Sequence, residues 1–279
     1  MVDFSMTFAT LSPNPDIPPS PSPDITQDNR ALFDTYADIF ARRASEYQHA
    51  MTAWPDARAA EFRAVLAPFA PAPTGLLGDL PSGGAYLARY LPPGLAYVGV
   101  DPAEGFVTAP HAPEARLVRA PITAVPLADA SLDHLVSLAG LHHEEDLGAV
   151  FAEMRRLLRP GGLAVVADVA AGTPAATFLN GFVDAHNPMG HDGRFLDENT
   201  AALVEAAGLT ILDDALTSMP WRFASRGEAG AFCKYLFGLP GLGAAAVAEG
   251  MAGDIGFDDD ADGGVSLRWA LRRLVCRAE

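Results

Sequence analysis

Two aspartates follow short apolar runs, in a pattern that could bind a ligand. Asp79 lies in the segment LLGDLPSGGAYLARYL (residues 76–91), where an apolar run is followed by a turn with Gly83 and Gly84 and then by a predicted helix. Glycines let the backbone approach a ligand closely, and a helix start supplies unpaired N–H groups. Asp101 ends a second apolar run, AYVGV, twenty-two residues after Asp79. An acid at the tip of a second strand can accept hydrogen bonds from ribose hydroxyls, so the pair predicts a nucleoside site.

The residues that follow Asp79 indicate which class of nucleoside the site could bind. A dinucleotide site requires G-x-G-x-x-G with the pyrophosphate on a helix N-terminus, and the segment from Asp79 to Ala85 does not supply it. A carboxylate would also repel a diphosphate. The same carboxylate can attract the ammonium of an amino-acid moiety, and acidic surroundings favour a sulfonium cation. The pattern therefore disfavours a nicotinamide oxidoreductase and favours an adenosyl amino acid.

From about residue 75, apolar runs alternate with helical stretches, which predicts strand–helix–strand units around a parallel sheet. An amphipathic helix is predicted from Leu147 to Leu158, ending at the turn from Arg159 to Gly162, because Pro cannot extend a helix and Gly permits a reversal. A further helix is predicted near Glu198 to Ala207. The predicted strands are Gly75 to Leu80, Ala96 to Val100, Arg116 to Val118, His134 to Leu138, Leu163 to Val169, Leu209 to Leu212 and Val265 to Cys276.

Over about residues 71–216 and the final strand, the chain resembles a class I S-adenosylmethionine-dependent methyltransferase. Asp79 matches the acid of that family's first motif, acid-x-Gly-x-Gly-x-Gly, and Gly83 matches its middle glycine, while Pro81 and Ala85 stand at the outer glycines. Asp101 matches the ribose-binding acid. The segment APITAVPLADASLDHLVSLAGLHHEEDLGAVFAEMRRLLRPGGLAVV resembles the family's run from the third strand through the Arg-Pro-Gly-Gly turn.

The resemblance implies a fold, a cofactor and a reaction. The fold is a Rossmann-like three-layer α/β sandwich with a mostly parallel seven-stranded sheet and an antiparallel last strand. The reaction is methyl transfer from S-adenosylmethionine to a small molecule; the alternative is a protein of the same fold that binds the cofactor or a nucleoside without transferring methyl. The implied cofactor-binding residues are Asp79, Pro81, Ser82, Gly83, Gly84, Asp101, Pro102, Pro121, Ile122 and Leu138.

A general base is needed only if the acceptor must lose a proton. His143 follows the fourth predicted strand, at the carboxyl edge where ligands bind in open α/β sheets, and imidazole is readily poised near neutral pH. His143 is therefore the first candidate for the base, and Tyr235 is the second. The alternative for His143 is a loop or helix-cap histidine.

The segments outside this core predict an arm, a cap and a lid. Residues 1–25 form a Pro-rich disordered arm, residues 26–70 a helical cap, and residues 71–279 the core, with a lid insert at about 217–264 whose aromatic residues could equally be plain core. The predicted substrate contacts are Tyr36, His186, His191, Trp221, Arg222 and Tyr235. No metal is predicted, because the spacing of the histidines and of the acidic run near Asp260 fits no ligand pattern.

Composition and net charge indicate which partners and which cell compartment are favoured. The 279 residues carry 19 Lys and Arg against 35 Asp and Glu, a formal charge of -16, which disfavours nucleic acid and anionic membranes as partners. No apolar run reaches about 18 residues, so no membrane span is predicted. Two cysteines and the absence of a leader pattern favour the cytoplasm. Monomer and homodimer both stay open.

Overall fold

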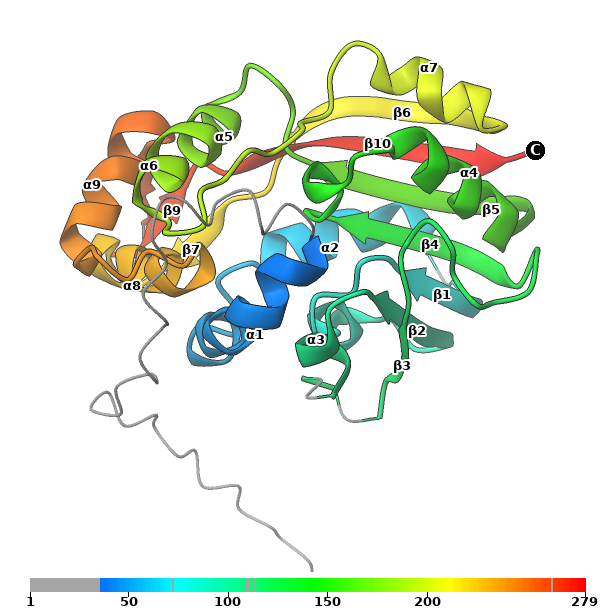
Figure 1. The fold of residues 1–279 in the computed structure, drawn as a ribbon, viewed down its shortest axis with the longest axis horizontal. Helices are drawn as coiled ribbons and strands as arrows, with labels where there is room; N and C mark the ends of the chain where they lie inside the picture. The colour runs from blue at the N-terminus through cyan, green and yellow to red at the C-terminus, as the bar shows by residue number, and fades with distance from the viewer. Residues whose placement is uncertain (1–35, 72, 109–110, 113, 262) are drawn as a thin grey trace, which may run out of the picture.

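The computed structural model describes residues 36–71, 73–108, 111–112, 114–261 and 263–279. Their main sheet has seven strands in the order β3-β2-β1-β4-β5-β10-β6 (Figure 1). Strands β1 to β5 pair in parallel, and β10 runs antiparallel between β5 and β6. This confirms the predicted Rossmann-like sheet with an antiparallel last strand. The strands are β1 (Gly75–Asp79), β2 (Leu95–Asp101), β3 (Arg116–Arg119), β4 (Leu132–Leu138), β5 (Leu158–Asp168), β6 (Leu209–Ser218) and β10 (Ala270–Ala278).

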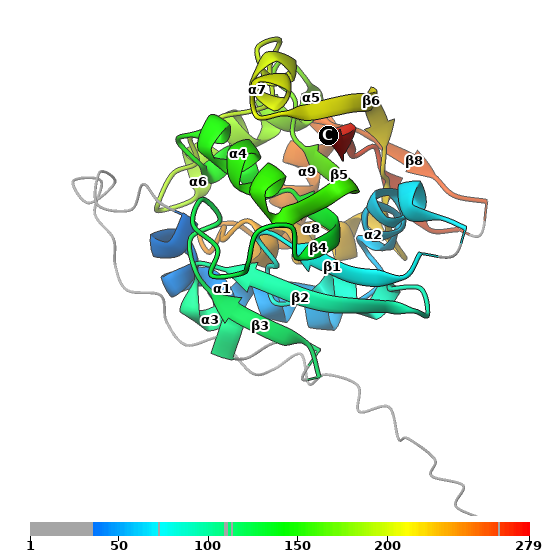
Figure 2. The ribbon, with the colours of Figure 1, turned by 90° about the vertical axis from the view of Figure 1, so that its right-hand side faces the viewer.

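Strand β5 is buried on both of its faces. Ala164 and Val166 belong to one apolar core, with α4 (Leu147–Leu157) and α7 (Thr200–Ala206), while Val165 and Ala167 belong to another that includes α2 (Ala59–Leu66). Successive side chains of a strand point to opposite faces, so a strand covered on both sides must be continuously apolar. Helices α4 and α7 lie together over the β5 and β6 half of the sheet (Figures 1 and 2). The result is the predicted three-layer arrangement.

The prediction of a helix after β1 is wrong. Only a five-residue 3-10 helix, η3 (Tyr86–Tyr90), follows the loop. Gly83, Gly84 and Ala85 all have positive φ, at 53°, 92° and 65°. Residues in the left-handed region cannot extend a right-handed helix, and prolines follow η3 directly. The helix N-terminus expected to face the ligand is therefore absent, and the loop supplies its own N–H groups.

The predicted final strand is divided in two. Residues Val265–Leu267 form β9 in a small antiparallel sheet with β7 (Trp221–Phe223) and β8 (Phe257–Asp259), and β10 then joins the main sheet. The turn predicted from Arg159 to Gly162 lies within β5, at a break in its pairing with β4.

Two groups of elements lie beyond the edge toward which β4 points in Figure 1. The first is α1 (Tyr36–Ala53), and the second is the small sheet with α8 (Arg226–Leu236) and α9 (Ala244–Asp254), whereas α2 packs on the face of β4 and β5. Helix α1 packs against α8 and α3. The proposed arm, residues 1–25, lies outside the described residues. The remaining elements are η2 (Ala67–Phe69), α3 (Glu104–Thr108), η4 (Leu141–His143), α5 (Pro174–Thr177), η5 (Phe178–Val183) and α6 (Asp184–His186).

Every helix in the described part of the chain is too short or too polar to cross a bilayer.

A buried ion pair joins the N-terminal helices to the insert. Arg58 and Glu61, 5% and 0% exposed, pair through Nε and Oε2. Arg58 also donates to the Tyr47 hydroxyl at 2.8 Å, and its guanidinium lies 5.4 Å from the centre of the Trp221 ring. Charges removed from water must be paired to be tolerated. This pair therefore fixes how α1, α2 and β7 meet.

Removing one partner of this pair leaves the other as an uncompensated buried charge, which costs about 3–5 kcal/mol. We therefore expect Glu61→Ala and Arg58→Ala each to lower the free energy of unfolding by roughly that amount in urea titrations. The double variant should lose less than the sum of the two, because it has no orphan charge. The exposed pair Arg268 and Asp258 is the control, and Asp258→Ala should leave stability nearly unchanged. Additive losses would contradict this account.

Candidate functional site

Asp101 holds the loop that follows β1. Its carboxylate is fully buried at the end of β2 and accepts the Gly83 N–H at 2.8 Å and the Ala103 N–H at 2.9 Å. The Tyr36 hydroxyl, from α1, donates to it at 3.3 Å. The contact with Tyr36 is long for an O–H donor, so it is the weakest of the three. The structure thus brings Asp101, Gly83 and Tyr36 together.

Asp79 ends the neighbouring strand β1 and is 3% exposed. It accepts a hydrogen bond from the Tyr97 hydroxyl at 2.7 Å. Burial raises the pKa of Asp79 to about 7, against the lowering effect of the Tyr97 hydrogen bond, and burial raises the pKa of Asp101 to about 6. Burial penalises a charged carboxylate that has no cation partner. Two such acids at one sheet edge favour a ligand that carries positive charge.

A small cavity of about 40 Å³ lies beside Asp79, and we call it the Asp79 cavity. Among the predicted cofactor residues it is lined by Asp79, Pro81, Ser82, Gly83 and Leu138, and Tyr36, Tyr47 and Arg58 line it from the N-terminal helices. Pockets for whole small molecules are typically about 300–1,000 Å³. Helix α1 contributes to the walls of this cavity, which in this conformation is too small for a nucleoside.

Five predicted cofactor residues do not line the Asp79 cavity in this conformation: Gly84, Asp101, Pro102, Pro121 and Ile122. The Gly84 carbonyl accepts the His111 N–H at 2.9 Å, and Ile122 is buried in the apolar core that contains α4. Pro102 is half-buried and Pro121 is exposed. Their role at the cofactor stays a prediction.

A second cavity, of about 80 Å³, adjoins the first, and we call it the histidine cavity. Phe40, Tyr47, Arg58 and Ala139 line both cavities. The polar lining of the histidine cavity includes Arg43, His142, His143 and His191, and its apolar lining includes Phe237, Trp221 and Trp269. The two cavities therefore share part of one wall.

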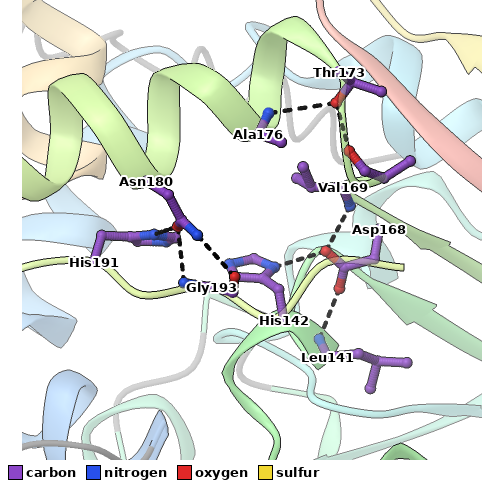
Figure 3. A network of polar contacts seen from close by, with 10 residues as sticks. Leu141, His142, Asp168, Val169, Thr173, Ala176, Asn180, His191 and Gly193 are labelled. Atoms are coloured by element: carbon purple, nitrogen blue, oxygen red, sulfur yellow. Dashed lines mark hydrogen bonds and ion pairs between the residues drawn. The ribbon is translucent and has the colours of Figure 1, made fainter. Parts of the chain in front are cut away.

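His142 has a buried carboxylate partner. Its Nδ1 lies 2.7 Å from Oδ1 of Asp168, which ends β5 and is 1% exposed (Figure 3). Asp168 also accepts the N–H groups of Leu141 and Val169, each at 2.7 Å. An ionised carboxylate can only accept, so Nδ1 of His142 carries the hydrogen of this contact, and Nε2 is the ring nitrogen that stays available to another partner. His142 thus resembles a base that is oriented by an acid.

The other two imidazoles are neutral. Nδ1 of His191 donates to Oδ1 of Asn180 at 2.9 Å, and Asn180 is itself fixed by two hydrogen bonds to Gly193 (Figure 3). Burial, with the charges of His142 and Arg43, lowers the pKa of His191 to about 3. Burial also places the pKa of His143 well below its usual range. Ring nitrogens of His142, His143 and His191 lie within 4.8 Å of one another.

The predicted substrate residues separate into two groups. His191 and Trp221 line the histidine cavity, and Tyr36 lies in the Asp79 cavity with its ring 5.9 Å from that of His143. Three others lie outside both cavities. His186 is exposed and bonds the Phe182 carbonyl, Arg222 pairs with Asp260, and Tyr235 packs edge-on against His49 at 4.5 Å.

Sequence reasoning missed Arg43, Arg58 and Asp168. Asp168 carried a usable signal, because it ends an apolar strand in the same way as Asp79 and Asp101. No sequence signal pointed to the two arginines, because helix periodicity does not show which face of a helix lines a cavity. His142 was passed over for His143 because only the fold reveals which ring has the carboxylate partner.

Sequence comparisons bear on the part of the chain that carries the site. Residues 79–166 match the sequence family described as "Methyltransferase domain". Over 88 residues the chain is 35% identical to the ubiquinone/menaquinone biosynthesis C-methyltransferase UbiE of Geobacter sulfurreducens, covering 29% of this chain and 34% of that protein. Over 93 residues it is 41% identical to an uncharacterized methyltransferase of Mycolicibacterium gilvum, covering 32% and 36%. The chain thus spans about a third of the length of these relatives.

Solved structures share the fold over a longer stretch. A geranyl diphosphate methyltransferase in complex with S-adenosylmethionine superimposes with a TM-score of 0.54 at 14% identity, covering 84% of this chain and 90% of that one. Residues 79–166 thus match a methyltransferase domain, and the fold around them is the one found in solved methyltransferases. A Thermotoga maritima protein titled as an S-adenosylmethionine-dependent methyltransferase, possibly for histamine, matches this domain with a TM-score of 0.54 at 20% identity, covering 64% of this chain and 83% of that one. At these identities the structures establish the fold alone.

The first loop of this methyltransferase domain is packed from two sides. A Cβ placed on Gly140 would lie 2.3 Å from Cγ of Pro81, and one on Gly99 would lie 2.8 Å from Cβ of Ser82. Both distances are shorter than real Cβ contacts, so Gly140 and Gly99 are required where they stand. They explain how a loop with Pro at the usual first glycine still fits against the sheet.

We expect Gly140→Ala to displace Pro81 and to lower the free energy of unfolding by about 1–3 kcal/mol, the usual cost of overpacking. The φ of Gly140 is -137°, which alanine adopts freely, so the effect isolates the contact with Pro81. Gly253→Ala in α9 is the control, because a Cβ there meets nothing within 4 Å. Equal thermal stability of the two variants would show that the loop is not held in this way.

Proposed function

We propose that the protein transfers a methyl group from S-adenosylmethionine to a small-molecule acceptor. The observation that carries the proposal is the pair of buried carboxylates, Asp79 and Asp101, at the ends of adjacent strands beside two adjoining cavities. The match of residues 79–166 to methyltransferase sequences supports the same conclusion.

The residues present fit this cofactor. Asp79 has a hydroxyl partner but no described cation partner, so it suits the cofactor's ammonium. Asp101 suits the ribose hydroxyls, one of which would replace the weak Tyr36 contact. Arg58 lines the same cavity and offers a cation to the cofactor's carboxylate. The cofactor supplies an electrophilic methyl group on a sulfonium.

The chain's own residues orient the acceptor and exclude water. The apolar walls of the histidine cavity hold the acceptor next to the Asp79 cavity, and such positioning supplies much of the acceleration of a displacement. We assign the base to His142, since Nε2 can take a proton while Asp168 stabilises the resulting imidazolium. His143, with no carboxylate partner, lies beside it.

Calorimetric titration with S-adenosylmethionine and with S-adenosylhomocysteine tests the cofactor. We expect both to bind and to compete, and Asp101→Ala to weaken both by roughly tenfold to a hundredfold, because hydrogen bonds to a charged group contribute about 1.5–3 kcal/mol. Asp258→Ala removes the same charge from an exposed site and should change nothing. Absence of binding by the unmodified protein would end the proposal. Binding without methyl transfer to any acceptor would favour the alternative of a non-methylating nucleoside-binding protein.

The pKa of Asp79 predicts a pH dependence of cofactor affinity. With a pKa of about 7, Asp79 takes up a proton as the pH falls, and the cofactor's ammonium must then displace it. Affinity should be full above pH 7 and fall by up to about tenfold per pH unit below it. Tyr97 and Asp101 also act on Asp79, and Asp101 itself titrates at about 6. We therefore expect Asp79→Asn to bind weakly and with little slope between about pH 6 and 7.5; an unchanged slope would contradict the assignment.

A further inference from the structure

Arg43 brings a positive charge to the histidine cavity. Its Nη2 donates to the Leu236 carbonyl at 2.7 Å, and its guanidinium lies 5.9 Å from the Phe40 ring. Its Nε is buried with no hydrogen-bond partner, and no described carboxylate forms an ion pair with Arg43. Burial lowers the pKa of Arg43 only to about 10, so it stays charged at neutral pH. The residue is half-buried and the charge of Glu46 also acts on it, but a buried Nε donor without a partner still favours an anionic ligand.

The imidazoles beside Arg43 differ in how they can act on a proton, because His191 and His143 resist protonation. His191 and His143 are neutral, and the charge of Arg43 is one cause of this. His142 presents Nε2, because Nδ1 is held by Asp168. The cavity thus combines a proton acceptor with a cation that stabilises the oxyanion left behind.

Three clustered imidazoles are also a familiar ligand set for zinc. The positive charge of Arg43 opposes a divalent cation at this place. Asp168 does not compensate this positive charge by binding the metal itself, because both of its oxygens already accept hydrogen bonds from Leu141, Val169 and His142. The electrostatics therefore favour an ionisable hydroxyl over a metal.

The walls of the cavity suit a flat ring. Trp221 and Trp269 lie with ring centres 4.4 Å apart, and Phe40 and Phe237 line the same cavity. Aromatic side chains bind aromatic ligands through stacked or edge-on contacts. A cavity of about 80 Å³ has room for little more than a single ring.

We propose that the methyl acceptor is a small phenol, which the histidine cavity binds with its oxygen beside Arg43. The idea rests on the proposed methyl transfer and adds the class of substrate. An amine that binds as its ammonium would be repelled by Arg43, a carboxylic acid would need no base, and an aliphatic alcohol is too weak an acid to be ionised by neutral imidazole.

The step balances with the proposed cofactor as methyl donor. The phenol's proton passes to Nε2 of His142, and an oxygen lone pair forms the new O–CH₃ bond. The S–CH₃ bond breaks, and its electron pair stays on sulfur as a neutral thioether. The products are an aryl methyl ether, S-adenosylhomocysteine and a protonated His142, which returns its proton to solvent.

Binding of 4-nitrophenol tests this proposal without methyl transfer, because only its ionised form is yellow. We expect the full-length protein, saturated with S-adenosylhomocysteine, to bind the probe and to lower its apparent pKa by about one unit or more. Arg43→Met should abolish that shift and weaken binding, and Arg43→Lys should restore part of it. Arg42→Met, an exposed neighbour on α1, is the matched control and should behave as the unmodified protein. Unchanged affinity for S-adenosylhomocysteine and unchanged thermal unfolding would establish that the Arg43 variants are folded.

Three results would overturn the proposal. Failure to bind S-adenosylhomocysteine would remove the proposed function and this inference with it. Intact binding of S-adenosylhomocysteine, with the probe unbound or its pKa unshifted, would remove the phenol alone. Tight stoichiometric uptake of Zn²⁺ that is lost in His142→Ala and His191→Ala would assign the cluster to a metal instead. Formation of 4-nitroanisole from 4-nitrophenol and S-adenosylmethionine, detected by mass spectrometry, would support it.

Discussion

The site depends on one constraint, which is the burial of carboxylates at the carboxyl edge of a parallel sheet. Asp101, Asp79 and Asp168 end β2, β1 and β5, and each is at most 3% exposed. Burying such groups is unfavourable unless hydrogen bonds or cations compensate. Backbone N–H groups compensate Asp101 and Asp168, whereas Asp79 has a single tyrosine hydroxyl. The least satisfied acid is therefore the one best suited to bind a cationic ligand.

One helix serves both cavities. Tyr36, Arg43 and Tyr47 are spaced by seven and four residues on α1, so they lie on one face of the helix. Tyr36 lines the Asp79 cavity and donates to Asp101, and Arg43 lines the histidine cavity. A movement of α1 that admits the cofactor would also shift the cation that faces the acceptor. Ordering of the two ligands is thus coupled through a single element.

The sequence predicted the sheet and the position of two of the three buried acids at its edge, because these follow from local patterns. Continuous apolar runs predict strands covered on both faces, and an acid that ends such a run must lie at the sheet edge. The helix after β1 was predicted wrongly, since leucine and tyrosine spacing gave no sign that three successive residues take left-handed φ. His143 as a base stays a prediction, and only the fold shows that its neighbour His142 has a carboxylate partner.

The sequence alone determined most of the strands of the main sheet and where acids end them. Only the tertiary structure decided which groups face one another. Tyr36 meets Asp101 across 65 residues, His142 meets Asp168 across 26, and Arg43 meets Leu236 across 193. A local sequence pattern reflects the periodicity of the backbone. The partner of a side chain depends on how helices and strands that are distant in sequence pack together, and no single segment contains that information.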